Sequence, residues 1–193
     1  LSFLAMTSCN PKKEQINTSQ NQSDQSISFK YSAKTKNYVS AHRGGSEIKG
    51  YPENCIETFN HLYQQGIQIF EIDVAKTKDD QLILMHDNSL QRTSTGRQDV
   101  NQINLNQIKE YFLVDDFGQH TSFLIPTFTE ALNWGKQKPI YFMVDIKKGV
   151  DYRDIVKQIE QTNMQNQVVL VTYTLGQAKK MHQLAPNMLL SVS

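Results

Sequence analysis

The chain has 193 residues, of which 38% are hydrophobic and 20% are charged, and its formal net charge is +1. This length suits one domain, or part of a larger one, with enough apolar material for a sizeable core. The near-neutral charge and the absence of a clustered basic stripe exclude an electrostatic case for nucleic-acid binding, and two cysteines give no basis for a disulfide framework.

The N-terminal segment has two parts. Residues 1–9, "LSFLAMTSC", are a short apolar run followed by small residues and Cys9. They resemble the end of a bacterial lipoprotein signal, in which the cysteine receives the lipid. Residues 10–36 are rich in Asn, Gln, Ser and Lys, which predicts a flexible tether. We therefore expect an exported protein, anchored to a membrane through Cys9 in the periplasm or at the cell surface; a cleaved secretory signal and an incidental apolar terminus are the alternatives.

From residue 37 onward, strand and helix patterns alternate along the chain. Strand patterns cover residues 38–42, 67–74, 81–87, 139–147, 168–173 and 187–193, and helix patterns cover 54–66, 104–112, 127–136, 151–163 and 174–185. Thr127 and Glu130 have the spacing of a capping box at a helix start. The predicted short helix at 104–112 lies within a polar stretch, residues 91–124, which we interpret as a short insertion.

This alternation predicts an α/β domain over residues 37–193, with parallel strands covered by helices. A (β/α) TIM barrel and an open doubly wound sheet both fit the pattern. A complete TIM barrel has roughly 250 residues and eight such strands. We therefore expect an incomplete barrel whose C-terminal strands are missing, with an exposed strand edge and low stability as an isolated piece.

The strand pattern at 67–74 carries two carboxylates inside an apolar run. Glu71 and Asp73 are two residues apart and therefore face the same side of a strand. Burying both without a cation raises the pKa of at least one of them, a cost that Ca²⁺ or Mg²⁺ would remove. Asp145 and Lys147 repeat this spacing on another strand. Because the ends of parallel strands converge at one edge of a sheet, we expect these groups to meet.

Basic and imidazole side chains end two other strand patterns. His42 and Arg43 close the first strand, ahead of two glycines that permit a sharp turn, and His86 closes the strand at 81–87. Two imidazoles can divide general base and general acid catalysis between them, while Arg and Lys bind anionic oxygens. Together with a divalent cation, this set matches the requirements of phosphodiester hydrolysis.

Six segments occur in this order along residues 38–193: "AHRGG", "PENCIETF", "FEIDVAKTKDDQLILMHD", "LQRTSTG", "IPTFTEAL" and "VDIK". Together they resemble the glycerophosphodiester phosphodiesterases, a family of metal-dependent TIM barrels. The resemblance implies hydrolysis of a small-molecule glycerophosphodiester to an alcohol and glycerol 3-phosphate. It implies His42 and His86 as the general acid/base pair, Glu71, Asp73 and Asp145 as ligands of one Ca²⁺ or Mg²⁺ ion, Arg43 and Lys147 as phosphate contacts, and Glu53 and Asn54 as supports of the metal site or the substrate.

Within these segments the chain departs in places from the usual family residues, one being "TKDD" for the common "TKDG". The family usually has Glu where this chain has Asp145, and Thr is frequent where it has Cys55. A barrel phosphodiesterase of the sphingomyelinase D or phospholipase type is an alternative, as is a non-catalytic surface lipoprotein that binds a phosphorylated ligand. At the level of single residues, Glu53 and Asn54 could instead cap the following helix, and Asp145 and Lys147 could form an ordinary ion pair.

Overall fold

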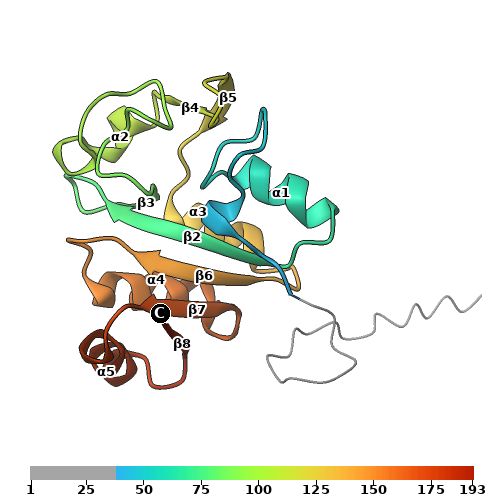
Figure 1. Ribbon diagram of the computed structural model, residues 1–193. Helices are drawn as coiled ribbons and strands as arrows, with labels where there is room; N and C mark the ends of the chain where they lie inside the picture. Colours follow the sequence, from blue (N-terminus) through green and yellow to red (C-terminus); the bar gives the residue numbers. More distant parts are fainter. Residues whose placement is uncertain (1–37) are drawn as a thin grey trace, which may run out of the picture.

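The computed structural model describes residues 38–193, which are coloured along the chain in Figure 1. The predicted signal remnant, the predicted tether and Cys9 lie outside the described residues and stay predictions. Within the described part, no helix has the length and apolar character that a membrane span requires.

A six-stranded sheet forms the centre of the molecule, in the order β1-β2-β6-β7-β8, with β3 paired to β2 (Figure 1). Neighbours along the main order are parallel, whereas β3 is antiparallel to β2. The α/β class with a parallel sheet is therefore as predicted; over residues 38–193 the sheet is open, with β1 and β8 at its two ends. The bounds are Ser40–Ala41 (β1), Ile69–Lys76 (β2), Leu82–Leu84 (β3), Tyr141–Ile146 (β6), Val168–Thr172 (β7) and Leu189–Val192 (β8).

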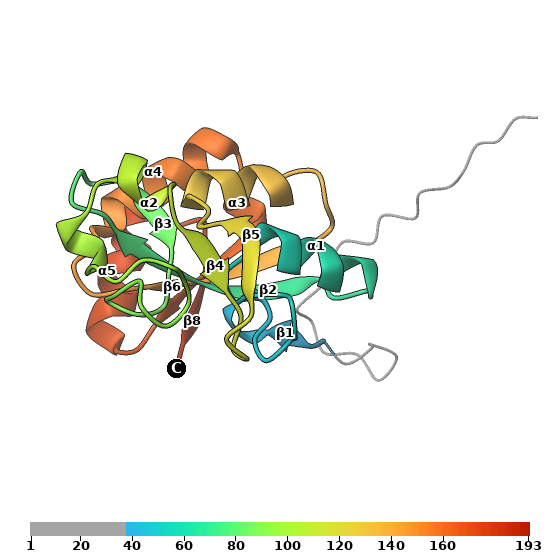
Figure 2. The same cartoon turned by 90° about the horizontal axis from the view of Figure 1, so that it is seen from above.

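Helices cover one face of this sheet. Figure 2 shows α1, α3 and α4 on the same side of β2 and β6. Side chains alternate along β2, and Phe70, Ile72 and Val74 point toward these helices. All three are fully buried in one core with residues of the helices. Burial of a large apolar side chain stabilises the fold by roughly 1.5–3 kcal/mol, so this face determines which way the strand lies. The helix bounds are Ile56–Gln64 (α1), Phe128–Gly135 (α3), Tyr152–Thr162 (α4) and Leu175–Leu184 (α5).

The predicted capping box is present at the start of α3. The backbone N–H of Glu130 donates to the hydroxyl of Thr127 at 3.1 Å, and the backbone N–H of Thr127 donates to the Glu130 carboxylate at 2.7 Å. Two backbone donors that the helix itself leaves unpaired are thereby satisfied.

The insertion differs from its prediction. The helix expected at 104–112 is the single turn α2, Leu105–Ile108, and β4, Phe112–Val114, pairs antiparallel with β5, His120–Leu124. The prediction missed this hairpin because β5 is a polar, half-exposed strand with no continuous apolar run. The insertion packs on a second buried cluster, made of Cys55, Ala75, Ile83, Met85, Leu90, Val100, Ile103, Ile108, Leu113 and Ile125.

Both histidines predicted to end strands lie just beyond them. His42 begins the short 3₁₀ turn η1, His42–Gly44, rather than closing β1, because Arg43 and Gly44 have φ of 53° and 68° and turn the chain sharply. His86 lies two residues after the last residue of β3. These positions place both side chains in loops, where they are free of the strand pairing.

Candidate active site

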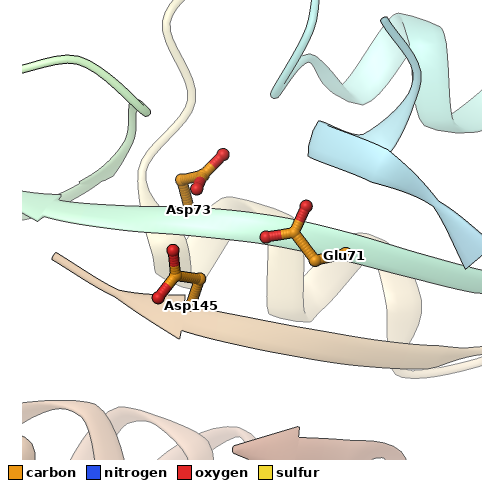
Figure 3. Close-up of side chains that lie close together, drawn as sticks. All are labelled: Glu71, Asp73 and Asp145. Carbon is orange, nitrogen blue, oxygen red and sulfur yellow. The ribbon is translucent and has the colours of Figure 1, made fainter. Parts of the chain in front are cut away.

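Three carboxylates meet on the face of the sheet opposite to α1, α3 and α4. The parallel register of β2 and β6 sets Asp73 beside Asp145 and Glu71 beside Met143. One oxygen of each carboxylate of Glu71, Asp73 and Asp145 lies within 4.8 Å of the others, and Figure 3 shows the three side chains grouped over the two strands. Their convergence therefore follows from strand register and from the period-two alternation of side chains.

Lys147 lies against two of these carboxylates. Its Nζ is 2.6 Å from Asp73 Oδ1 and 2.6 Å from Asp145 Oδ2, so it reduces the repulsion between the two neighbouring aspartates. The predicted ion pair between Lys147 and Asp145 is present, but it is not isolated, because the ammonium group also contacts Asp73.

One ammonium group leaves the cluster of three carboxylates with two negative charges when all are ionised. Burial, followed by the charge of Asp73, raises the pKa of Glu71 to about 7. A largely buried set of carboxylate oxygens with two uncompensated negative charges fits a hard divalent cation such as Ca²⁺ or Mg²⁺. Glu71, Asp73 and Asp145 are the residues that would hold it.

Asn54 supports the cluster from the loop before α1. Its Nδ2 donates to Asp73 Oδ2 at 2.8 Å, and its Oδ1 accepts from the backbone N–H of Asp73 at 3.0 Å. Asn54 has φ of 52°, a left-handed conformation that asparagine adopts more readily than most residues. It does not cap α1, whose N-cap residue is Cys55, so the alternative of a simple helix cap is wrong for this residue.

The turn η1 connects the first strand to the carboxylate cluster. The backbone N–H of Arg43 donates to Glu71 Oε2 at 2.7 Å. Gly44 packs directly on α1, where an added Cβ would lie 1.9 Å from the ring of Phe59. A glycine is therefore required here both for its positive φ and for its lack of a side chain.

His42 lies on the same turn, at a cavity of about 460 Å³. The volume is in the range of small-molecule sites. Because Arg43 and Glu53 also belong to its wall, the cavity adjoins the polar groups that surround the carboxylate cluster. The lining residues are His42, Arg43, Ser46, Glu47, Glu53, Asp116 and Phe117.

His86 is held between two charged neighbours. Arg43 Nη2 lies 3.1 Å from His86 Nε2, and His86 Nδ1 lies 2.7 Å from Asp87 Oδ1. A guanidinium group can only donate hydrogen bonds. The Nε2 atom therefore accepts from Arg43, and the proton of the neutral ring resides on Nδ1, from which it is donated to Asp87.

Glu53 lies at the wall of the cavity that contains His42. It is 3% exposed and contacts no carboxylate of the cluster; instead it bonds Arg43 and Arg92. Burial raises its pKa, but hydrogen bonds and charge from Arg92 and then Arg43 outweigh burial and hold it below the ordinary value. Glu53 is thus ionised and buried, and its role as a helix cap is excluded because the cap of α1 is Cys55.

Two charged residues near His86 received no role from the sequence. Hydrogen bonding from Arg92, and then from His86, lowers the pKa of Asp87 to about 2. Arg92 belongs to the "LQRTSTG" segment and pairs with both Glu53 and Asp87. An arginine in a short turn close behind a candidate catalytic histidine was the available signal, but its partners are 5 and 39 residues away and no local pattern points to them.

The predicted phosphate contacts are placed differently from one another. The Lys147 side chain is 21% exposed beside the carboxylates. The Arg43 side chain bonds Glu53 and His86, and its Nε is buried without a hydrogen-bond partner among residues 38–193. Cys55 is fully buried, and burial raises the pKa of its thiol to about 12, which excludes a thiolate nucleophile at neutral pH.

Comparison with known proteins identifies relatives of this arrangement. The model of the glycerophosphoryl diester phosphodiesterase family matches residues 42–186. Glycerophosphodiester phosphodiesterases of Bacillus altitudinis and Caldanaerobacter subterraneus subsp. tengcongensis are 31% and 29% identical over 80% and 79% of this chain. The chain spans 65% of the length of each of these two relatives.

Solved structures show the same fold. A crystal structure of a glycerophosphoryl diester phosphodiesterase from Parabacteroides distasonis superposes with a TM-score of 0.77 and 32% identity, over 84% of this chain and 56% of that protein. The fold class inferred from the sequence, α/β of the TIM-barrel type, is thereby confirmed. The chain belongs to the glycerophosphoryl diester phosphodiesterase family.

Proposed function

We propose that this chain hydrolyses glycerophosphodiesters to an alcohol and glycerol 3-phosphate. The observation that carries the proposal is the convergence of the Glu71, Asp73 and Asp145 oxygens within 4.8 Å, beside a cavity lined by His42 and Arg43, in a chain of this family. A phosphodiesterase of Oleispira antarctica, which shares the fold at 21% identity, was crystallised with the product sn-glycerol-3-phosphate. That product is consistent with the reaction proposed for this chain.

The carboxylate cluster supports dependence on a divalent cation. When bound, Ca²⁺ or Mg²⁺ polarises a phosphoryl oxygen and stabilises the charge that develops on it. Lys147 already lies beside the cluster, with part of its side chain exposed, and is placed to bind a second phosphoryl oxygen as a point charge. Arg43 supplies a further positive group at the cavity wall. The phosphodiester is thus held by positive charge on one side of the sheet.

The two histidines divide the proton transfers. One imidazole accepts the proton of the attacking oxygen, from water or from a substrate hydroxyl, and the other donates a proton to the alcohol oxygen as the P–O bond breaks. Over the full reaction one water is consumed, and its two hydrogens end on the alcohol and the phosphate. With its proton on Nδ1, His86 would accept a proton at Nε2, the nitrogen that lies 3.1 Å from Arg43 Nη2.

The activity is tested with the purified chain and two substrates, glycerophosphocholine and glycerophosphoglycerol. Glycerol 3-phosphate release is followed through a coupled dehydrogenase, first in chelator and then after addition of Mg²⁺ or Ca²⁺. We expect release only with the cation. His42→Ala and His86→Ala should each lower kcat by about 10²–10⁴-fold, whereas His182→Ala, at an exposed position of α5, should leave it unchanged.

The same assay separates the alternatives. Choline release from sphingomyelin, without cleavage of the water-soluble diesters, would show a reaction of the sphingomyelinase D type. A phosphoinositide phospholipase would release a phosphorylated head group instead. Retained binding of glycerol 3-phosphate with no turnover of any substrate would identify a non-catalytic binding protein and would overturn the proposed function.

A further inference from the structure

Arg92 joins two carboxylates with a single guanidinium group. Its Nη1 and Nη2 donate to the two oxygens of Glu53 at 2.8 and 2.7 Å. Its Nε donates to Asp87 Oδ2 at 2.7 Å, and Nη2 also donates to Asp87 Oδ1 at 3.1 Å. This geometry uses the planar fork of arginine on both sides, which a lysine ammonium cannot reproduce.

Each of these carboxylates then contacts a group of the candidate active site. Asp87 accepts from Nδ1 of His86 at 2.7 Å, and Glu53 accepts from Nη1 of Arg43 at 3.1 Å. Arg43 in turn donates to Nε2 of His86 at 3.1 Å. The contacts form a closed ring of five side chains: Arg92, Glu53, Arg43, His86 and Asp87.

The ring has a consequence for His86. Both of its nitrogens are bonded by groups that Arg92 orients: Nδ1 through Asp87, and Nε2 through Glu53 and Arg43. Only one neutral tautomer satisfies both bonds, because Asp87 can only accept and Arg43 can only donate. The ring therefore sets the plane of the imidazole and the atom that carries its proton.

We infer that Arg92 is a positioning residue for the hydrolysis proposed above: by bridging Glu53 and Asp87 it holds His86 in its Nδ1-protonated form and Arg43 at the cavity wall. The expected kinetic effects of Arg92 rest on the proposed function, whereas the expected tautomer of His86 does not depend on turnover. Arg92 lines no part of the cavity that contains His42, so its action passes through Asp87 and Glu53.

A purely structural role is the competing explanation. Arg92 also lies 3.5 Å from Asp116 on the β4–β5 connection, so it could serve only to hold the insertion, to which both residues belong, against Glu53 and Asp87. That role predicts a lower melting temperature for Arg92 variants, together with unchanged kcat and unchanged histidine tautomers below melting. The two explanations therefore differ in observables other than stability.

The kinetic test compares Arg92→Ala and Arg92→Lys with Arg97→Ala. Arg97 is an exposed arginine of the same insertion and serves as the matched control. We expect kcat of both Arg92 variants to fall by about 10–100-fold, the usual cost of losing a group that orients a ligand or catalyst, with a smaller rise in KM. Guanidinium ion at low, non-denaturing concentration should partly restore kcat of the alanine variant. Full activity of Arg92→Lys would overturn the inference, because lysine keeps the charge and loses the bridge.

A spectroscopic test does not depend on turnover. Nitrogen-15 NMR distinguishes the two imidazole tautomers, and the His86 signals are assigned by their loss in His86→Gln. In the unaltered chain we expect distinct shifts for a protonated Nδ1 and an unprotonated Nε2. In both Arg92 variants these shifts should converge toward a tautomeric average, and in Arg97→Ala they should not change.

The two tests separate failure of the inference from failure of the proposed function. An unaltered chain that cleaves no diester refutes the proposed function, and the NMR comparison still decides the role of Arg92. Unchanged His86 shifts in folded Arg92 variants, with circular dichroism confirming the fold, refute the inference whether or not the chain is active. The lysine variant keeps this comparison possible if the alanine variant does not fold.

Discussion

Glu71→Gln should have opposite effects on metal binding and on the stability of the metal-free fold. Glu71 has its pKa raised from an ordinary 4.5 to about 7, chiefly by burial and then by Asp73. The folded chain therefore binds this proton more tightly than the unfolded chain does. The free energy of unfolding is therefore highest below pH 4.5, and it falls as pH rises from 4.5 through 7 and Glu71 ionises in the folded state.

The size of this cost follows from the displacement of the pKa. Each pKa unit represents about 1.36 kcal/mol, so the upper bound is about 3 kcal/mol, and partial solvent access reduces it to about 1–2 kcal/mol. Gln keeps an oxygen that can accept from the backbone N–H of Arg43, a bond now 2.7 Å long. In chelator at pH 8, the variant should therefore be about 1–2 kcal/mol more stable than the unaltered chain, and near pH 4 the two should be equal.

Divalent cation should reverse this order. A ligand that binds only the folded state stabilises it by RT ln(1 + [L]/Kd), which is about 2.7 kcal/mol at a hundredfold excess over Kd. Urea unfolding with and without Mg²⁺ or Ca²⁺ measures both effects, with Glu110→Gln, an exposed carboxylate near α2, as the control. A Glu71→Gln variant that is less stable than the unaltered chain at pH 8 in chelator would refute the electrostatic reasoning, and one that gains equally from the cation would refute the assignment of Glu71 as a ligand.

Three further changes test other parts of the structure. Gly44→Ala should destabilise the chain by at least about 2–3 kcal/mol, because a Cβ there would meet an aromatic ring of α1 at 1.9 Å; Gly118→Ala, also at positive φ but in open space, should cost only about 1 kcal/mol by thermal unfolding. Asp87, whose pKa is lowered to about 2 chiefly by hydrogen bonding from Arg92, should contribute stability above pH 4 that is lost as pH falls through 2, so Asp87→Asn should flatten that part of an acid-unfolding curve. Asp145→Glu should retain cation binding by calorimetry because it keeps the oxygen donors, whereas Asp145→Ala should lose it; equal affinities in these two variants would show that this carboxylate is not a ligand.

Much of the fold follows from patterns that are local in the chain. The β/α alternation, the helix starting after Thr127 and the common side of Glu71 and Asp73 all depend on residues two to four positions apart, where backbone geometry alone determines which side chains are neighbours. Convergence of the carboxylates also followed, because parallel strands connected by helices have few ways to pair. The hairpin of β4 and β5 could not be predicted from the sequence, because its strands are stabilised by packing against residues outside the segment.

The sequence by itself determined the fold class, the face on which the carboxylates lie and the residue types available for catalysis, because periodicity and composition are local properties. The tertiary structure decided the arrangement around them: the register that sets Asp73 beside Asp145, the bonds of Asn54 to Asp73 and the bridge of Arg92 between Glu53 and Asp87. These pairings join residues up to 72 positions apart, and their energies arise only when folding has buried and aligned both partners, so no local pattern encodes them.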